Sequence, residues 1–184
     1  MNEQEILEYF RTQSEKYLPK KIKYLLISES PPNDIRNYFF FDGPKPKNQM
    51  FFQNIVKAIY HEHCANNQTC KKYFLNKFKE DGFYLIGAVE YPIVDCTNTK
   101  RKKNILDGLP DLIEKLIDFN RRNLTNHETK ISLIKKLVCE LIKDPLEDNE
   151  DIIFNRSIGV GEVGFPKFFS DPLFAESIRD YFKL

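Results

Sequence analysis

The chain has 184 residues, of which 41% are hydrophobic and 30% are charged, a balance typical of one folded domain over 1–184 and not of a disordered chain. Its 28 basic and 27 acidic residues leave a formal net charge of +1, which excludes a protein that holds nucleic acid by bulk charge alone. No apolar run reaches the roughly 20 residues of a membrane-spanning helix. Because the acidic start lacks an export signal and the four cysteines fit reduced thiols, we expect a cytoplasmic monomer that does not bind membranes.

The first half of the chain predicts helices that alternate with buried strands. Ile6, Leu7 and Phe10 recur at helical spacing, and the apolar run 22–27 has the length of a buried strand. In order, we expect a helix over 3–17, a strand over 22–27, amphipathic helices that include 51–59 and 73–78, and a strand over 83–89.

The second half of the chain contains one ambiguous segment. Residues 130–143 fit either one continuous helix or a strand over 131–134 followed by a helix. Around this segment we expect a basic loop over 100–103, a helix that includes 112–117, a strand over 152–154 and a helix that begins at Asp171 and Pro172.

The order of elements predicts the fold class. Strands separated by helices imply parallel pairing through right-handed crossovers. We therefore expect an α/β protein, built as a three-layer α/β/α sandwich with a small, mainly parallel, four-stranded sheet. In such a sheet ligands bind outside the carboxyl ends of the strands, so functional residues are expected in the loops that follow them.

The first predicted strand is followed closely by an acidic residue, Glu29, and a polar residue, Ser30. Burial at a strand end raises the pKa of a carboxyl group, which predicts acid–base or electrostatic work for Glu29. The alternative is a carboxylate that accepts backbone N–H bonds and fixes the proline-rich loop.

Aromatic and basic residues near the same edge suit a nucleic-acid ligand. Phe40 and Phe41 offer rings on which a base stacks, although alternation along the run turns half of its rings toward the core. A basic loop after the second strand is placed to contact phosphates, the alternative being a solvated charged surface. Its members are Lys100, Arg101, Lys102 and Lys103.

The tightest group of potential metal ligands is His61, His63, Cys64 and Cys70. Structural zinc sites usually pair their ligands at short spacings such as C-x-x-C, which this group lacks. We therefore expect a polar helix end with two buried thiols, and neither a metal nor a cofactor. A zinc-stabilised domain is the alternative.

The run 26–32 (Leu-Ile-Ser-Glu-Ser-Pro-Pro), followed by Phe40 and Phe41, resembles the first motif of the uracil-DNA glycosylase superfamily. That motif reads G-Q-D-P-Y-H in one branch and G-E-A-P-G in another, with a base-stacking Phe further on. A strand that ends in Lys135, and later Phe165 and Pro166, are similar to uncharacterised members of the superfamily. The resemblance implies a strand and then a helix for the ambiguous segment.

The resemblance also implies a function. Glu29 matches the glutamate of the G-E-A-P-G branch, and Phe40 or Phe41 matches the stacking ring. Ser30 stands where the other branch has its catalytic aspartate, and Asn155 is a polar substitute near the place of the family's H-P-S motif. These matches imply a domain that binds a nucleobase or DNA and removes a damaged or deaminated base by hydrolysis. Because the histidine motif is missing, a non-catalytic module that binds nucleic acid or protein is the alternative.

Overall fold

The computed structural model of the protein describes residues 2–47, 49–94, 97–154, 159–160 and 172–183. It shows a mixed α/β protein with seven α-helices in these ranges. The helices are α1 (Glu3–Lys16), α2 (Met50–Tyr60), α3 (Gln68–Glu80), α4 (Asn98–Asp107), α5 (Leu109–Arg121), α6 (Lys136–Glu147) and α7 (Pro172–Phe182). The strands are β1 (Tyr24–Ser28), β2 (Phe83–Gly87), β3 (Lys130–Leu133) and the two-residue β4 (Gly159–Val160), and η1 (Ile35–Asn37) is a single 3₁₀ turn.

A small open parallel sheet of three strands forms the centre of the molecule, with β1 between β2 and β3. In the register, Ile27 of β1 lies opposite Ile86 of β2 and Leu133 of β3. The short β4 pairs with the end of β3, also in parallel. Because the strands run in the same direction, the segments that leave β1, β2 and β3 meet at one edge of the sheet.

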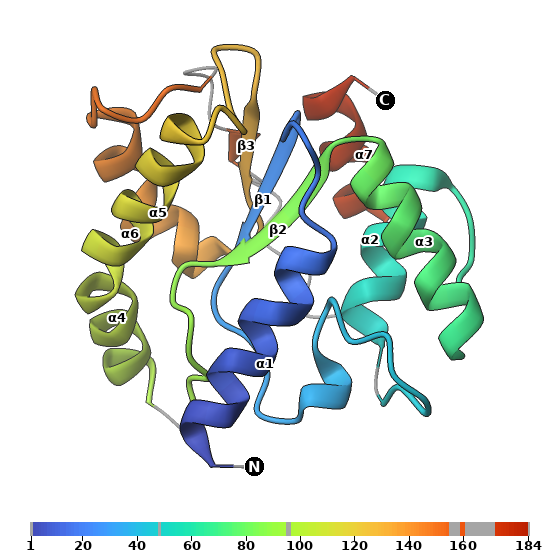
Figure 1. Cartoon of the computed structure of the whole chain (residues 1–184). Coiled ribbons are helices and arrows are strands. Elements are labelled where there is room, and N and C mark those ends of the chain that lie inside the picture. Colours follow the sequence, from blue (N-terminus) through green and yellow to red (C-terminus); the bar gives the residue numbers. More distant parts are fainter. Residues whose placement is uncertain (1, 48, 95–96, 155–158, 161–171, 184) are drawn as a thin grey trace.

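Helices lie on both sides of the strands. Figure 1 shows α2, α3 and α7 on one side and α4, α5 and α6 on the other. Leu25, Leu26 and Ile27 are fully buried, as expected for strands that helices cover on both faces. Continuous burial explains why β1 corresponds to an uninterrupted apolar run in the sequence.

Most of the expected elements are present, including the ambiguous segment, which is strand β3 followed by helix α6. The basic stretch 100–103 was expected to be a loop, and this is wrong because it lies within α4. Thr97 caps that helix by accepting a hydrogen bond from the backbone N–H of Lys100 (3.3 Å), and Ile105 anchors it in the core. The final helix begins at Pro172 as expected, while Asp171 lies outside the described residues.

The expected strand over 152–154 is also wrong, because these residues adopt no strand. The side chain of Asn120 on α5 takes the place of a neighbouring strand. It accepts a hydrogen bond from the N–H of Ile153 (2.8 Å) and donates one to the carbonyl of the same residue (3.0 Å). Ile152 and Phe154 on either side of Ile153 are buried, which accounts for the apolar run that had predicted a strand.

Within the described ranges, none of the helices combines the length and the apolar character needed to cross a membrane.

Candidate functional site

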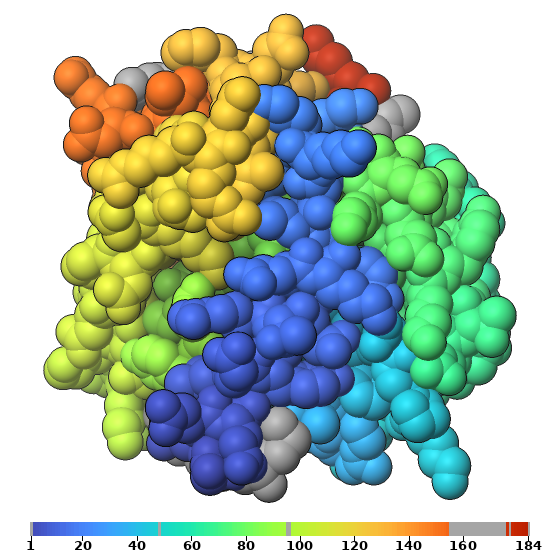
Figure 2. Space-filling view, in the orientation of Figure 1, coloured from blue at the N-terminus to red at the C-terminus, as the bar shows by residue number. Residues whose placement is uncertain are grey.

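A cavity of about 1130 Å³, here called the cleft, lies at the carboxyl edge of the sheet. Its walls come from α1, from the segments that follow β1 and β2, and from α5. Figure 2 shows the surface hollowed between α1 and the helices α4 and α5, with atoms of the segment after β2 inside the recess. The cleft is thus the place where the loops leaving neighbouring parallel strands converge.

Glu29 lines the cleft directly after the end of β1 and is only 3% exposed. The Nε and Nη2 atoms of Arg101 donate to its Oε1 and Oε2 at 2.7 and 2.6 Å. The Nζ of Lys135 donates to Oε2 at 3.0 Å. The carboxylate therefore joins three elements, because it follows β1 while its partners lie on α4 and at the start of α6. We call Glu29, Arg101 and Lys135 the ion triad.

The ion triad corrects the expected titration of Glu29. Burial alone raises the pKa of this carboxyl group, but the hydrogen bond from Arg101 and the charge and hydrogen bond of Lys135 together outweigh that effect, so the pKa lies below its ordinary value. The expectation of a raised pKa is therefore wrong. Glu29 is an ionised acceptor at neutral pH and not a proton donor. Its hydrogen bonds come from side chains, so it does not fix the proline-rich loop by accepting backbone N–H bonds.

The two phenylalanines expected to stack a base lie in the core. Phe40 is fully buried and its ring stacks on Tyr17, with centroids 6.1 Å apart and planes 11° apart. Phe41 is 6% exposed, and neither ring lines the cleft. The expectation that either ring offers a stacking face is wrong in this structure, because both rings are buried: Phe40 packs against neighbouring rings, and the Phe41 ring lies beside the amine of Lys71.

Other aromatic rings line the cleft instead. These are Phe10, Tyr38, Phe39, Phe51, Tyr84, Tyr91 and Phe119. Tyr38 and Phe51 are half-buried, and their rings also pack on Phe10 (centroids 4.5 Å apart) and Phe39 (5.8 Å), respectively. The hydroxyl of Tyr38 donates to the carbonyl of Phe10 on α1 at 3.3 Å. Burial raises the pKa of Tyr84 to about 12, so its phenol stays protonated at neutral pH.

A tight turn after β2 gives the cleft its shape. A Cβ atom at Gly87 would lie 2.4 Å from the carbonyl oxygen of Val89, which is closer than real Cβ contacts allow. Val89 in turn donates its backbone N–H to the carbonyl of Glu29 at 3.2 Å. The absence of a side chain at Gly87 therefore lets the segment after β2 approach the segment that carries Glu29.

The four basic residues of α4 do not act as one patch. Arg101 reaches the cleft, whereas Lys100 and Lys102 are exposed and do not line it. Lys103 pairs with Asp107 one turn later on the same helix. The structure thus places one member of the stretch beside Glu29 and leaves the others on the helix surface.

Of the two remaining residues predicted for the site, Ser30 and Asn155, the structure describes only the first. Ser30 is half-buried and lines the cleft next to Glu29. Asn155 lies outside the described residues. Sequence reasoning missed Lys135 as a partner of Glu29, although Lys135 follows the buried strand β3 closely, as Glu29 follows β1. It also missed the ion pair of Glu90 with Lys115 (2.6 Å) at the cleft.

The four potential zinc ligands do not form a metal site. His61 and His63 are exposed, Cys64 is buried and Cys70 is half-buried. Across the part of the chain that the structure describes, no three His, Cys, Asp or Glu side chains gather in a way that suits a metal ion. Burial, followed by the neighbouring Cys70, raises the pKa of the Cys64 thiol to about 12. The arrangement of these four residues therefore gives no support to the zinc alternative.

Comparison with known proteins gives no relative: no family model, no curated protein and no solved structure matches the chain. The relationship to the uracil-DNA glycosylase superfamily stays a prediction from the sequence motifs.

Proposed function

We propose that the cleft binds a nucleobase within DNA and that the protein hydrolyses the N-glycosidic bond of a damaged or deaminated base. The proposal includes the finer fold expected of such a protein, a three-layer sandwich around a four-stranded sheet. The observation that carries it is the buried, ionised Glu29 at the wall of a cleft that aromatic side chains also line. Cleavage of the bond leaves a cationic sugar, and a fixed carboxylate stabilises that charge or orients the attacking water.

The size and lining of the cleft suit a flat ligand with polar edges. Its volume of about 1130 Å³ exceeds what a single nucleotide fills. The half-buried rings of Tyr38 and Phe51 provide the aromatic surface that Phe40 and Phe41 do not. Stacking of a base on an aromatic ring is worth about 1–3 kcal/mol. Ser30 and the ion triad supply hydrogen-bonding groups beside that surface.

The test uses oligonucleotides that carry uracil, hypoxanthine or xanthine. Wild-type protein should produce strand breaks after alkali treatment with at least one of them, and Glu29→Gln should reduce the rate by about 10²–10³-fold. Glu128→Gln, which changes an exposed glutamate of the loop before β3, serves as the matched control and should cleave at the wild-type rate. Absence of breaks with every substrate would remove the hydrolytic part of the proposal.

A second candidate is a non-catalytic module that binds nucleic acid or protein on the same scaffold. Both carboxylate oxygens of Glu29 already accept hydrogen bonds from Arg101 and Lys135, and this favours a structural role for the carboxylate. The salt dependence of DNA affinity separates the two kinds of partner. Contacts to phosphate give an affinity that falls steeply as salt rises, whereas a binder of proteins shows no DNA affinity to titrate.

A further inference from the structure

Lys71 on α3 is a buried lysine outside the ion triad, and it is 1% exposed. Its Nζ donates to the backbone carbonyl of Tyr38 at 2.8 Å and to the side-chain oxygen of Gln49. The rings of Phe52 and Phe41 lie 4.9 and 5.9 Å from the same nitrogen. A fully buried lysine is rare because burial disfavours its charge, so its two acceptors indicate what the side chain does.

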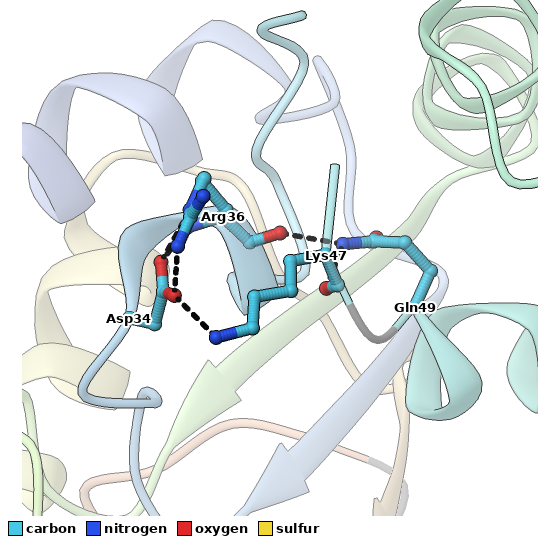
Figure 3. Close-up of polar contacts among 4 residues, drawn as sticks. All are labelled: Asp34, Arg36, Lys47 and Gln49. Carbon is cyan, nitrogen blue, oxygen red and sulfur yellow. Dashed lines mark hydrogen bonds and ion pairs between the residues drawn. The ribbon is translucent and has the colours of Figure 1, made fainter. Parts of the chain in front are cut away.

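Both acceptors belong to the chain that leads from β1 to α2. Figure 3 shows how this chain is held together: Asp34 pairs with Arg36 and Lys47, and Gln49 donates to the carbonyls of Arg36 and Lys47 at 2.6 and 2.9 Å. We call residues 34–47 the 34–47 segment. Lys71 therefore links α3 to the segment that carries Tyr38, both directly and through Gln49.

Among the residues that the structure describes, no acidic side chain pairs with Lys71 as a counter-ion. The titratable groups that face it are Asp42 of the 34–47 segment and Cys64 of the loop before α3. Asp42 instead binds Lys16 and the hydroxyl of Tyr17 (2.7 Å), and Cys64 keeps its proton because burial raises its pKa. Burial consequently lowers the pKa of Lys71 to about 7, against the weaker opposing effects of Cys64 and Asp42.

We propose that Lys71 is a positioning residue for the cleft: its buried amine holds the backbone of Tyr38, so that the Tyr38 ring stays at the cleft wall. An uncharged amine still has two N–H groups for the two acceptors, so the link persists when the proton is lost. The positioning role itself is independent of the ligand. Only its effect on affinity rests on the proposed function.

Because Lys71 holds the 34–47 segment through these hydrogen bonds, the equilibrium between the closed and the open form of the segment should depend on pH. Opening of the segment returns Lys71 to water, where its pKa takes the ordinary value of 10.5. Between about pH 7 and that value the open form binds a proton that the closed form lacks, so rising pH favours the closed form by up to about tenfold per pH unit. In the open form a Cys64 thiol that reaches water has its ordinary pKa of 9.0 and stays mostly protonated below about pH 8.5, while Asp42 stays ionised. Neither group therefore adds a comparable pH dependence in that window.

Amide hydrogen exchange without ligand tests the positioning role. In wild-type protein the protection factors of amides in the 34–47 segment, corrected for intrinsic exchange, should rise by up to about tenfold per unit between about pH 7 and about pH 8.5. Lys71→Met should lose this pH dependence, and Lys72→Met, which changes the exposed neighbour on α3, should keep it. Protection that is independent of pH in wild type, or equally dependent on pH in Lys71→Met, would overturn the proposal.

Two further measurements keep the test decisive. If Lys71→Met does not fold, NMR titration of the lysine side chains in wild-type protein replaces it: one amine should titrate near pH 7, and titration of every lysine near its ordinary pKa would overturn the proposal.

Binding of a uracil-containing oligonucleotide supplies the functional arm, in which Lys71→Met should bind at least about tenfold more weakly than Lys72→Met. Equal affinity of the two variants would show that Lys71 does not influence binding in the cleft. Failure of wild type to bind any oligonucleotide would count against the proposed function, while the exchange result would stand on its own.

Discussion

Arg101 contacts Glu29 through two nitrogens, with Nε 2.7 Å from Oε1 and Nη2 2.6 Å from Oε2, across 72 positions of sequence. This bidentate geometry is the strongest form of a carboxylate–guanidinium contact. The carboxylate is almost fully buried, while the side chain of Arg101 is 34% exposed. Glu29 is thus fixed in orientation. Loss of Arg101 removes two of its three hydrogen bonds and loss of Lys135 removes one, and either loss leaves a buried charge less well compensated.

Removal of Arg101 should destabilise the protein. Arg101→Met leaves the buried carboxylate with Lys135 alone, and the expected loss is about 2–4 kcal/mol in the free energy of unfolding, since breaking a buried ion pair from one side strands its partner. Urea denaturation measures this loss. Lys102→Met changes the exposed neighbour on α4 and should cost less than about 0.5 kcal/mol. Equal stabilities of the two variants would show that the ion triad contributes nothing to folding.

Acid should weaken the wild-type protein more than the Glu29→Gln variant. The pKa of Glu29 is lowered in the folded state, so its contribution to stability is present above the unfolded value of 4.5 and is lost as pH falls below it. The difference in unfolding free energy between the two proteins should therefore shrink as pH falls from about 6 to about 3. A difference that stays constant over this range would contradict the lowered pKa.

Tyr38 and Phe40 should separate affinity from stability. Tyr38→Leu removes a ring at the cleft wall and should weaken binding of a base by about 1–3 kcal/mol. Phe40→Leu changes a fully buried ring and should lower the unfolding free energy by about 1–3 kcal/mol while affinity remains the same. Parallel titrations and denaturation curves decide between these roles. Loss of affinity in Phe40→Leu alone would restore the stacking role first expected for that residue.

Asn120 should hold residues 152–154 in place. Asn120→Ala removes both hydrogen bonds to Ile153 and should cost about 1–2 kcal/mol, because the peptide group is left without those partners. The amide of Ile153 should also exchange with solvent faster. Asn66→Ala, in an exposed loop, is the control and should leave both quantities unchanged. An unaltered exchange rate at Ile153 in Asn120→Ala would show that another contact holds the segment.

The sequence predicted those helices and strands whose pattern of apolar residues lies within a short stretch of the chain. Short apolar runs located β1 and β2, because burial on both faces favours apolar residues throughout such strands. The segment of β3 stayed ambiguous by its pattern alone, and the family resemblance implied a strand there. Residues 152–154 (Ile-Ile-Phe) are also a short apolar run, but the side chain of Asn120 supplies the hydrogen bonds that a neighbouring strand would give. A contact across 33 positions leaves no mark in the local pattern.

The candidate site was predicted in position but not in chemistry. Glu29 lies in the cleft as its place after β1 indicated, since parallel strands bring their carboxyl ends together. The direction of its pKa depends on Arg101 and Lys135, which lie 72 and 106 positions away in the sequence. The choice of ring failed for a related reason: the burial of Phe40 comes from Tyr17 and Tyr84 on separate elements.

Photo-crosslinking with an oligonucleotide that carries a halogenated uracil tests the central claim most directly, because the label reports which residues touch the base. Crosslinked peptides identified by mass spectrometry should contain Tyr38 or Phe51, and crosslinking should diminish in Tyr38→Leu. Crosslinks confined to surfaces away from the cleft, or none at a concentration at which the oligonucleotide binds, would contradict the claim that the cleft beside Glu29 receives a nucleobase.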